Sequence, residues 1–223
     1  MIWLCWLLPL AGYAIGSVSF AYYAGKMKGI DLRQHGSGNL GATNAGRVLG
    51  KGWFAAVFVL DVLKGLIPTL IARFLCEPLD ASLAGLGIAT GAGAIAGHFL
   101  PCWHGFKGGK AVATSLGVLI ALVWMAAAIA AAAWLLAWGV GRLCRLKADE
   151  AVGPASMVAA LVVPVAHALT YPTPAQPAPL SGINLILTLF VTAAAVVVLI
   201  KHRRNAQDLL RRIRGHRAPP PAP

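Results

Sequence analysis

Residues 111–141 read AVATSLGVLIALVWMAAAIAAAAWLLAWGVG, and this uncharged run decides the fold class. Its length of about 30 residues exceeds the roughly 20 that one helix needs to cross a bilayer. Such a run is typical of a membrane protein. Two interpretations of its length are open: one long tilted helix, or two short helices separated by a turn.

The composition of the whole chain agrees with a membrane protein. Of its 223 residues, 58% are hydrophobic and 12% are charged, whereas soluble domains carry about 25% charged residues. The mean hydropathy is +0.73. We therefore predict an all-α, polytopic integral membrane protein in which residues 1–217 form a single domain and residues 218–223 form a disordered proline-rich tail.

Charge indicates where the remaining spans begin and end. Cytoplasmic flanks of membrane spans carry an excess of Lys and Arg. Nearly all Lys and Arg lie in the segments at 25–52, 101–110, 142–150 and 201–217. Besides the run at 111–141, the predicted spans are residues 1–24, 53–72, 81–100, 153–170 and 182–200.

The same rule decides how often the long run crosses. The segments on both sides of it are basic, so both are predicted to be cytoplasmic and the number of crossings between them is even. We therefore split the run into two helices that turn near Trp124. The result is seven transmembrane helices, with the N-terminus outside and the C-terminus in the cytoplasm. The alternative of six spans would place Arg142, Arg145 and Lys147 outside.

The net charge and the rarer residues exclude several function classes. The formal charge of +12 fits an anionic membrane surface and anionic substrates, and the apolar content argues against nucleic acid as a partner. The first basic residue, Lys26, follows the first apolar run, so no cleavable signal peptide is expected. The four cysteines form no CxxC pair and the histidines show no ligand spacing. No disulfide framework, metal or other cofactor is therefore expected.

The first basic loop, residues 29–50, reads GIDLRQHGSGNLGATNAGRVLG. Its glycines let the backbone turn tightly and point N–H groups at one centre. Ser37, Asn39, Thr43 and Asn44 add short polar groups, and Arg47 adds a guanidinium fork suited to phosphate. Thr43 or Asn44 is also placed to cap a helix that continues into the next span. We interpret the loop as a phosphate site, because a flexible linker does not need this density of polar groups.

The second basic loop, residues 97–115, reads GHFLPCWHGFKGGKAVATS. Two glycines between Lys107 and Lys110, directly before a helix, can form an anion cradle. The pattern GxxxxGK[ST] of nucleotide-binding loops is absent because Ala111 follows Lys110, which disfavours nucleotide hydrolysis. The alternative is a basic turn that only anchors the topology.

Other charged and polar residues have two interpretations each. Asp61 and Lys64 are three residues apart and can pair within the membrane, with a structural or a catalytic role. His98 lies at the end of the third span, where it can orient a hydroxyl, act as a base or be an interfacial histidine. The spacing of His202 and Asn205 puts them on one helix face, but a basic flank at 201–205 alone favours a membrane anchor.

In this order, the motifs resemble those of the acyl-phosphate:glycerol-3-phosphate acyltransferase family (PlsY type). The matching stretches are GS at 16–17, the loop at 29–50, LDVLKG at 60–65, GH at 97–98, GFKGGKAVATSLG at 105–117 and HRRN at 202–205. The resemblance covers nearly the whole chain.

The resemblance implies an activity, a location and a set of site residues. The family transfers a fatty acyl group from acyl phosphate to the 1-hydroxyl of sn-glycerol 3-phosphate, without a metal, at the cytoplasmic face of the bacterial inner membrane. A soluble enzyme that makes acyl phosphate is a further candidate partner. The predicted catalytic residues are Ser37, Arg47, His98, Lys107 and Asn205. The predicted phosphate-binding residues are Gly38, Asn39, Thr43, Asn44, Gly108, Gly109, Lys110, Ser156 and His202.

The sequence departs from the family pattern at three places. Ala111 stands where family members usually carry glycine, and Ser19 stands where proline is common. The third cytoplasmic loop reads VGPAS at 152–156, so that only Ser156 aligns with the family's pattern.

We expect the loop at 107–110 to hold the phosphate of the donor. Ser37, Asn39 and Arg47, with His202 and Asn205, are then expected to hold glycerol 3-phosphate. The base is His98 or a phosphate oxygen of the substrate. The main alternative function is a membrane carrier or binding protein for an anionic phosphorylated metabolite, but carriers place their sites near the membrane midplane. A structural membrane subunit is a third possibility.

Overall fold

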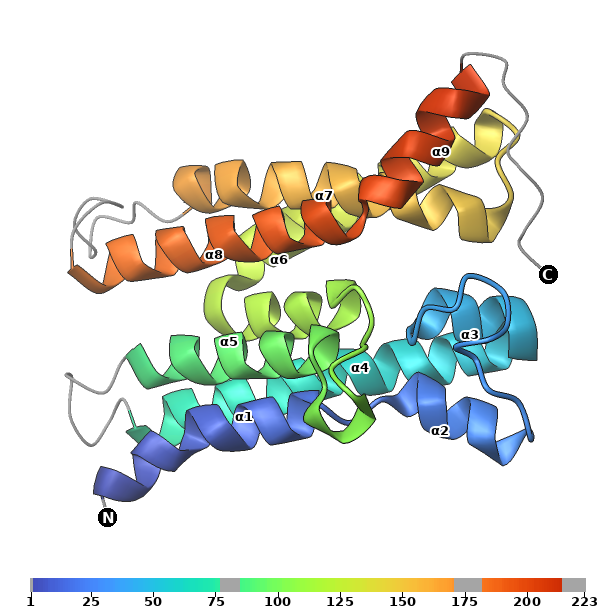
Figure 1. Ribbon diagram of the computed structural model, residues 1–223. Coiled ribbons are helices and arrows are strands. Elements are labelled where there is room, and N and C mark those ends of the chain that lie inside the picture. The colour runs from blue at the N-terminus through green and yellow to red at the C-terminus, as the bar shows by residue number, and fades with distance from the viewer. Residues whose placement is uncertain (1, 77–84, 171–181, 214–223) are drawn as a thin grey trace.

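The structure, a computed structural model, describes residues 2–76, 85–170 and 182–213, and every regular element in these ranges is a helix (Figure 1). The all-α prediction is thus confirmed. In chain order the elements are η1 Ile2–Leu7, α1 Leu8–Gly16, α2 Phe20–Met27, α3 Ala42–Leu49, α4 Lys51–Cys76, α5 Gly85–Phe99, η3 Cys102–His104, α6 Val112–Leu143, α7 Ala148–Thr170, α8 Gly182–Lys201 and α9 Arg203–Ile213.

Six stretches among the described residues are long and apolar enough to cross a membrane, which makes the chain a multi-pass membrane protein. They are Leu4–Met27, Lys51–Cys76, Gly85–His104, Val112–Leu143, Ala148–Thr170 and Gly182–Lys201. The predicted connection at 171–181 and the predicted tail at 218–223 lie outside the described residues.

The long helices pack in two layers. In Figure 1, α1, α4 and α5 form one layer and α7 and α8 form the other, while α6 packs on both. The contacts are close because small residues line them. A Cβ added at Gly97 would lie 2.2 Å from the carbonyl oxygen of Tyr13, and one at Gly65 would lie 2.3 Å from that of Thr114. Such small-residue contacts let membrane helices approach closely.

One helix, α6, is interrupted at Val123, whose φ of −145° and ψ of 58° are not helical. Before the break, α6 packs on α4, and after it Trp134 donates a hydrogen bond to Ser156 on α7 (3.1 Å). The far end of α6 reaches the start of α7, where Trp138 donates to the carbonyl of Ala148 (3.0 Å). The break lies one residue from the turn that the sequence predicted.

Several loops and short helices gather at one end of the bundle. This end, called the loop end below, carries α2, α3, the loops at 28–41 and 100–111, the α6–α7 connection and the start of α9 (Figure 1). Ion pairs and hydrogen bonds between Arg47 and Asp149, and between Lys110 and Asn205, join these segments. Both ends of α6 therefore lie at the loop end.

Two sequence predictions about helix ends are wrong. Neither Thr43 nor Asn44 caps α3, because the N-cap is Gly41 and makes no side-chain cap bond. Nor does α3 continue into the next span, since Gly50 adopts a φ of +104° that separates α3 from α4. The first predicted span is also broken, and Ser19 caps the new helix α2 by accepting a hydrogen bond from the Tyr22 amide (3.2 Å).

Candidate active site

The buried amide of Asn44 shapes the first loop. Its Oδ1 accepts a hydrogen bond from the Ser37 amide at 2.8 Å, and its Nδ2 donates to the carbonyls of Leu32 and His35 at 3.0 Å each. Gly36, with a φ of +63°, leaves room for this amide, since a Cβ there would lie 2.3 Å from Asn44 Oδ1. Asn44 thus organises the loop, while the Ser37 side chain stays exposed.

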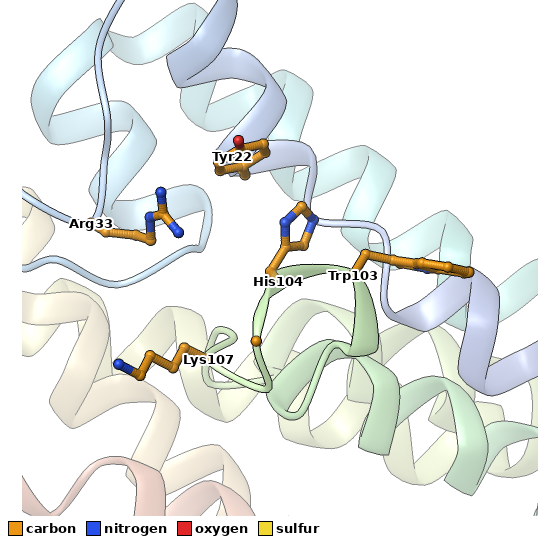
Figure 2. Close-up of a pocket in the computed structure, with 6 residues that line it drawn as sticks. Tyr22, Arg33, Trp103, His104 and Lys107 are labelled. Carbon is orange, nitrogen blue, oxygen red and sulfur yellow. The ribbon is translucent and has the colours of Figure 1, made fainter.

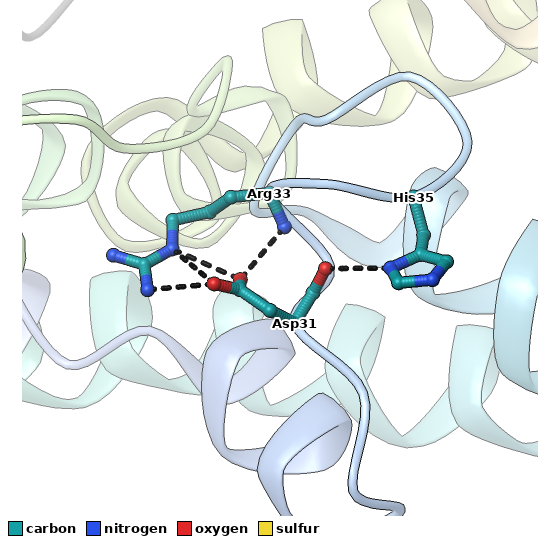
Figure 3. A network of polar contacts seen from close by, with 3 residues as sticks. All are labelled: Asp31, Arg33 and His35. Carbon is teal, nitrogen blue, oxygen red and sulfur yellow. Dashed lines mark hydrogen bonds and ion pairs between the residues drawn. The ribbon is translucent and has the colours of Figure 1, made fainter. Parts of the chain in front are cut away.

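A second set of contacts fixes the start of the same loop (Figure 3). Arg33 donates to both carboxylate oxygens of Asp31, at 2.8 to 3.2 Å. His35 Nδ1 lies 2.9 Å from the Asp31 carbonyl oxygen. The hydrogen bonds from Arg33 lower the pKa of Asp31 to about 2. Arg33 also lies over the ring of Tyr22 on α2, 5.4 Å from its centroid.

The second loop packs on the first through its glycines. The Gly109 amide donates to the carbonyl of His98 at 3.1 Å. A Cβ at Gly109 would lie 2.3 Å from His98 Nε2 and 2.8 Å from the carbonyl oxygen of Leu40 in the first loop. Ala111, which ends the loop and caps α6, has the left-handed φ of +59° that favours glycine. The two loops therefore meet at Gly109.

His98 lies beneath this junction. It is buried, and its Nδ1 is 3.1 Å from Thr114 Oγ1 and 3.7 Å from Asp61 Oδ1. Asp61 in turn pairs with Lys64 at 2.8 Å, as the sequence predicted. His98 thus contacts protein groups of α4 and α6, and its predicted catalytic role stays a prediction.

Lys110, Asn205 and Arg47 form a cationic cluster at the loop end. Lys110 Nζ donates to Asn205 Oδ1, and Arg47 Nε pairs with Asp149 Oδ2 at 2.7 Å. Burial, followed by the charge of Arg47, lowers the pKa of Lys110 to about 8, although the charge of Asp208 opposes the shift. The cluster unites α3, the glycine loop and α9.

His202 lies at the inner edge of this cluster. Its ring is buried, and Nδ1 lies 2.8 Å from the Val198 carbonyl oxygen. Burial, with the charge of Lys110 second, lowers the pKa of His202 to about 4. The imidazole is therefore neutral at pH 7 and is suited to hydrogen bonding rather than to charge neutralisation.

A pocket of about 390 Å³ lies between α2, the first loop and the loop at 100–111 (Figure 2). Its lining residues are Tyr22, Arg33, Trp103, His104, Gly105 and Lys107. The lining offers two cations and three aromatic rings, a composition suited to an anionic group attached to an apolar chain. Lys107 thus lines the pocket, whereas Lys110 belongs to the cluster. Sequence reasoning missed Arg33, Trp103 and His104, although the aromatic pair directly precedes the glycine motif.

The remaining predicted residues are placed less centrally. Gly38, Asn39 and Thr43 belong to the first loop and the start of α3. Ser156 is buried and its hydroxyl donates to the carbonyl of Val152 at 2.8 Å while it accepts from Trp134. Gly153 contacts the cluster instead, since a Cβ there would lie 2.3 Å from Asn205 Nδ2. In the part of the chain that the structure describes, no group of three His, Cys, Asp or Glu side chains is placed to hold a metal.

The chain matches known proteins along most of its length. Residues 6–212 match the family model described as glycerol-3-phosphate acyltransferase. A glycerol-3-phosphate acyltransferase of Desulforudis audaxviator (strain MP104C) is 40% identical over 200 residues, covering 89% of this chain and 88% of the relative. One of Synechococcus sp. (strain JA-3-3Ab) is 39% identical over 211 residues, covering 93% and 91%.

Two solved structures share the fold. Both are crystal structures of PlsY (YgiH), an integral membrane glycerol 3-phosphate acyltransferase. The glycerol 3-phosphate form has a TM-score of 0.76 and 34% identity, and the match covers 96% of each chain. The lysophosphatidic acid form has a TM-score of 0.71 and 31% identity, covering 92% of this chain and 91% of the other.

Proposed function

Because this chain belongs to the glycerol-3-phosphate acyltransferase family, we propose that it transfers a fatty acyl group from acyl phosphate to the 1-hydroxyl of sn-glycerol 3-phosphate. The products are lysophosphatidic acid and inorganic phosphate. The solved relatives bind glycerol 3-phosphate and lysophosphatidic acid, the acceptor and the product of this reaction. The reaction is the first acylation step of phospholipid biosynthesis.

The observation that carries the proposal is that the two lysines of one glycine loop lie in different surroundings. Lys107 lines an aromatic pocket, and Lys110 lies in a polar cluster with Arg47 and Asn205. Both substrates of the reaction carry a phosphate, and only the donor carries an acyl chain. A pocket with aromatic walls suits the donor, and a polar cluster suits the small acceptor.

We assign the substrates on this basis. Lys107 and the pocket hold the phosphate of acyl phosphate, with the Trp103 ring toward the acyl chain. Trp103 is 61% exposed and donates to the Ala14 carbonyl on α1 (3.1 Å), so its ring lies against a lipid-facing helix. The acceptor is held by the exposed Ser37 hydroxyl, Arg47 and the cluster around Asn205, together with the predicted ligands Gly38, Asn39 and His202. Lys110 belongs to this cluster, so we assign it to the acceptor, although the whole loop at 107–110 was expected to hold the donor.

The chemistry needs little beyond positioning. The acceptor hydroxyl oxygen attacks the acyl carbon, the bond from that carbon to the phosphate oxygen breaks, and inorganic phosphate leaves. Acyl phosphate is already activated, so orientation of the two substrates and neutralisation of the leaving phosphate supply most of the rate. Since His98 Nδ1 contacts Thr114 and Nε2 faces Gly109, we assign the proton of the hydroxyl to an oxygen of the donor phosphate.

The topology that we propose has seven spans, with the N-terminus outside and the loop end in the cytoplasm of a bacterial inner membrane. Two features support it. The helix α6 breaks at Val123 and both of its ends lie at the loop end, which suits two crossings. The basic segments also share this end, as the positive-inside rule requires of cytoplasmic loops.

An acylation assay on the purified protein tests the proposal. Detergent-solubilised protein receives radiolabelled glycerol 3-phosphate with palmitoyl phosphate or palmitoyl-CoA, and lysophosphatidic acid is expected from palmitoyl phosphate alone. Arg47→Ala and Lys107→Ala are each expected to lower kcat/KM by about tenfold or more, since each removes a charge-assisted hydrogen bond to phosphate. Lys26→Ala, at an exposed residue of α2, is the matched control. Unchanged rates in both site variants would refute the assignment, and binding without product would favour the carrier hypothesis.

A further inference from the structure

The ion pair between Asp61 and Lys64 has no place in the reaction described above. Both residues lie on α4, one turn apart, with side chains only 3% exposed and Nζ 2.8 Å from Oδ1. Taking two charges out of water is costly, and hydrophobic residues of similar volume are often at least as stable. The contacts that the pair makes beyond itself therefore indicate its role.

Lys64 contacts the break in the first span. Its Nζ donates to the carbonyl of Val18 at 2.7 Å. Val18 lies between α1 and α2, where the carbonyl has left the regular helix pattern. This contact fixes the direction in which α2 leaves the break. Because α2 carries Tyr22, it also fixes one wall of the pocket.

Asp61 lies close to His98. Its Oδ1 lies 3.7 Å from His98 Nδ1, and Thr114 at the start of α6 lies 3.1 Å from the same nitrogen. The His98 carbonyl accepts the hydrogen bond of the Gly109 amide, and a Cβ at Gly108 would lie 2.1 Å from that oxygen. A continuous chain of contacts thus runs from the ion pair to the glycine loop.

We propose that the Asp61–Lys64 pair is a positioning element that holds the glycine loop against α2. Through Val18 it places Tyr22, and through His98 it places the loop that carries Lys107. Asp61, Lys64 and Thr114 act as positioning residues and do not touch substrate. The inference rests on the proposed function only for its kinetic measurement.

Two variants test the role in the full-length protein. Asp61→Asn combined with Lys64→Met removes both charges together and so avoids a lone buried charge. Thr114→Val keeps the side-chain shape and removes the hydroxyl beside His98. The matched control is Thr69→Val, which removes a buried hydroxyl on α4 that donates to the Gly65 carbonyl at 2.7 Å. Amide hydrogen exchange and KM for palmitoyl phosphate are measured for each.

Faster exchange at residues 105–111 is expected in both test variants, with residues 183–198 of α8 at the parental rate. In the double variant, which also loses the contact of Lys64 with Val18, exchange in α2 is expected to rise as well. KM should rise by about tenfold or more, because small displacements of positioned groups are costly in rate and affinity. The control should match the parent protein in both measurements. The proposal would be overturned if the folded test variants had the exchange rates and the KM of the parent protein. It would also be overturned by an equal rise of exchange throughout the chain, or by faster exchange of the loop with an unchanged KM. If the parent makes no lysophosphatidic acid, the proposed function fails, whereas the exchange comparison still decides the positioning role.

Discussion

The protonation of Lys110 provides a sharp prediction about acceptor binding. Burial and the neighbouring charge of Arg47 lower its pKa from 10.5 to about 8. At pH 7 the amine is charged and can donate to a phosphate while it contacts Asn205. Above pH 8 it loses this proton, so affinity for glycerol 3-phosphate is expected to fall. The phosphate itself does not change in this range, because its second pKa is near 6.

The size of the loss of affinity follows from the hydrogen bond that Lys110 can no longer donate with a charge once it loses its proton. A charge-assisted hydrogen bond contributes about 1.5–3 kcal/mol, which is roughly 10- to 150-fold in affinity. KM for glycerol 3-phosphate should therefore rise about tenfold per pH unit above pH 8, toward the value of Lys110→Met. The stability of the free protein should change in the opposite sense. The unfolded chain binds the Lys110 proton more tightly, so the free energy of unfolding rises between pH 8 and 10.5 by at most about 1.4 kcal/mol per pH unit.

The assay is a series of initial rates at pH 7–9.5, with glycerol 3-phosphate varied and palmitoyl phosphate saturating. A blank without protein corrects for hydrolysis of the donor. Lys110→Arg is the matched variant, because arginine stays charged across the range, and its KM should not rise above pH 8. A KM of the parent protein that is flat to pH 9.5, or a profile identical in Lys110→Arg, would refute the role of Lys110 in acceptor binding.

Three further predictions concern the loops. Gly109→Ala should raise KM for glycerol 3-phosphate by about tenfold or more, because the new Cβ would lie 2.3 Å from His98 Nε2 and must displace the loop. A KM equal to that of the parent protein would contradict this packing. Ala111→Gly should raise the free energy of unfolding by roughly 0.5–1 kcal/mol, because the φ of Ala111 is +59°. Thermal unfolding in detergent measures the change, and a less stable variant would contradict the prediction. Asn44→Ala should lower that free energy by about 3 kcal/mol, since three loop hydrogen bonds are lost, and hydrogen exchange at Ser37 should accelerate; an unaltered exchange rate would show that the loop does not depend on Asn44.

Local chemistry in the sequence predicted much of the fold. Uncharged runs predicted the helices that are long enough to cross a membrane, and the break in α6 at Val123 lies beside the predicted turn at Trp124. The spacing of Asp61 and Lys64 predicted their pair. These features depend on residues close in the chain, where periodicity and charge are informative. The predicted N-cap of α3 at Thr43 or Asn44 is wrong because α3 begins after Gly41, without a hydrogen bond from a capping side chain.

The candidate site was harder to predict because its contacts join distant segments. Arg47 pairs with Asp149 and Lys110 bonds Asn205, across 102 and 95 residues of sequence. Nor does a motif reveal which polar groups face inward. Asn44 and Ser156, two of the predicted phosphate-binding residues, are buried and form hydrogen bonds with protein groups. Which side chains line a pocket depends on tertiary packing rather than on spacing.

Product stoichiometry is the decisive measurement for acyl transfer from acyl phosphate to glycerol 3-phosphate at the loop end. Purified protein receives palmitoyl phosphate and radiolabelled glycerol 3-phosphate, and lysophosphatidic acid and inorganic phosphate are measured in the same samples. Equal amounts of the two products are expected, with both formed more slowly in Arg47→Ala and Lys107→Ala. Phosphate release without lysophosphatidic acid, or lysophosphatidic acid formed equally well from palmitoyl-CoA, would contradict it.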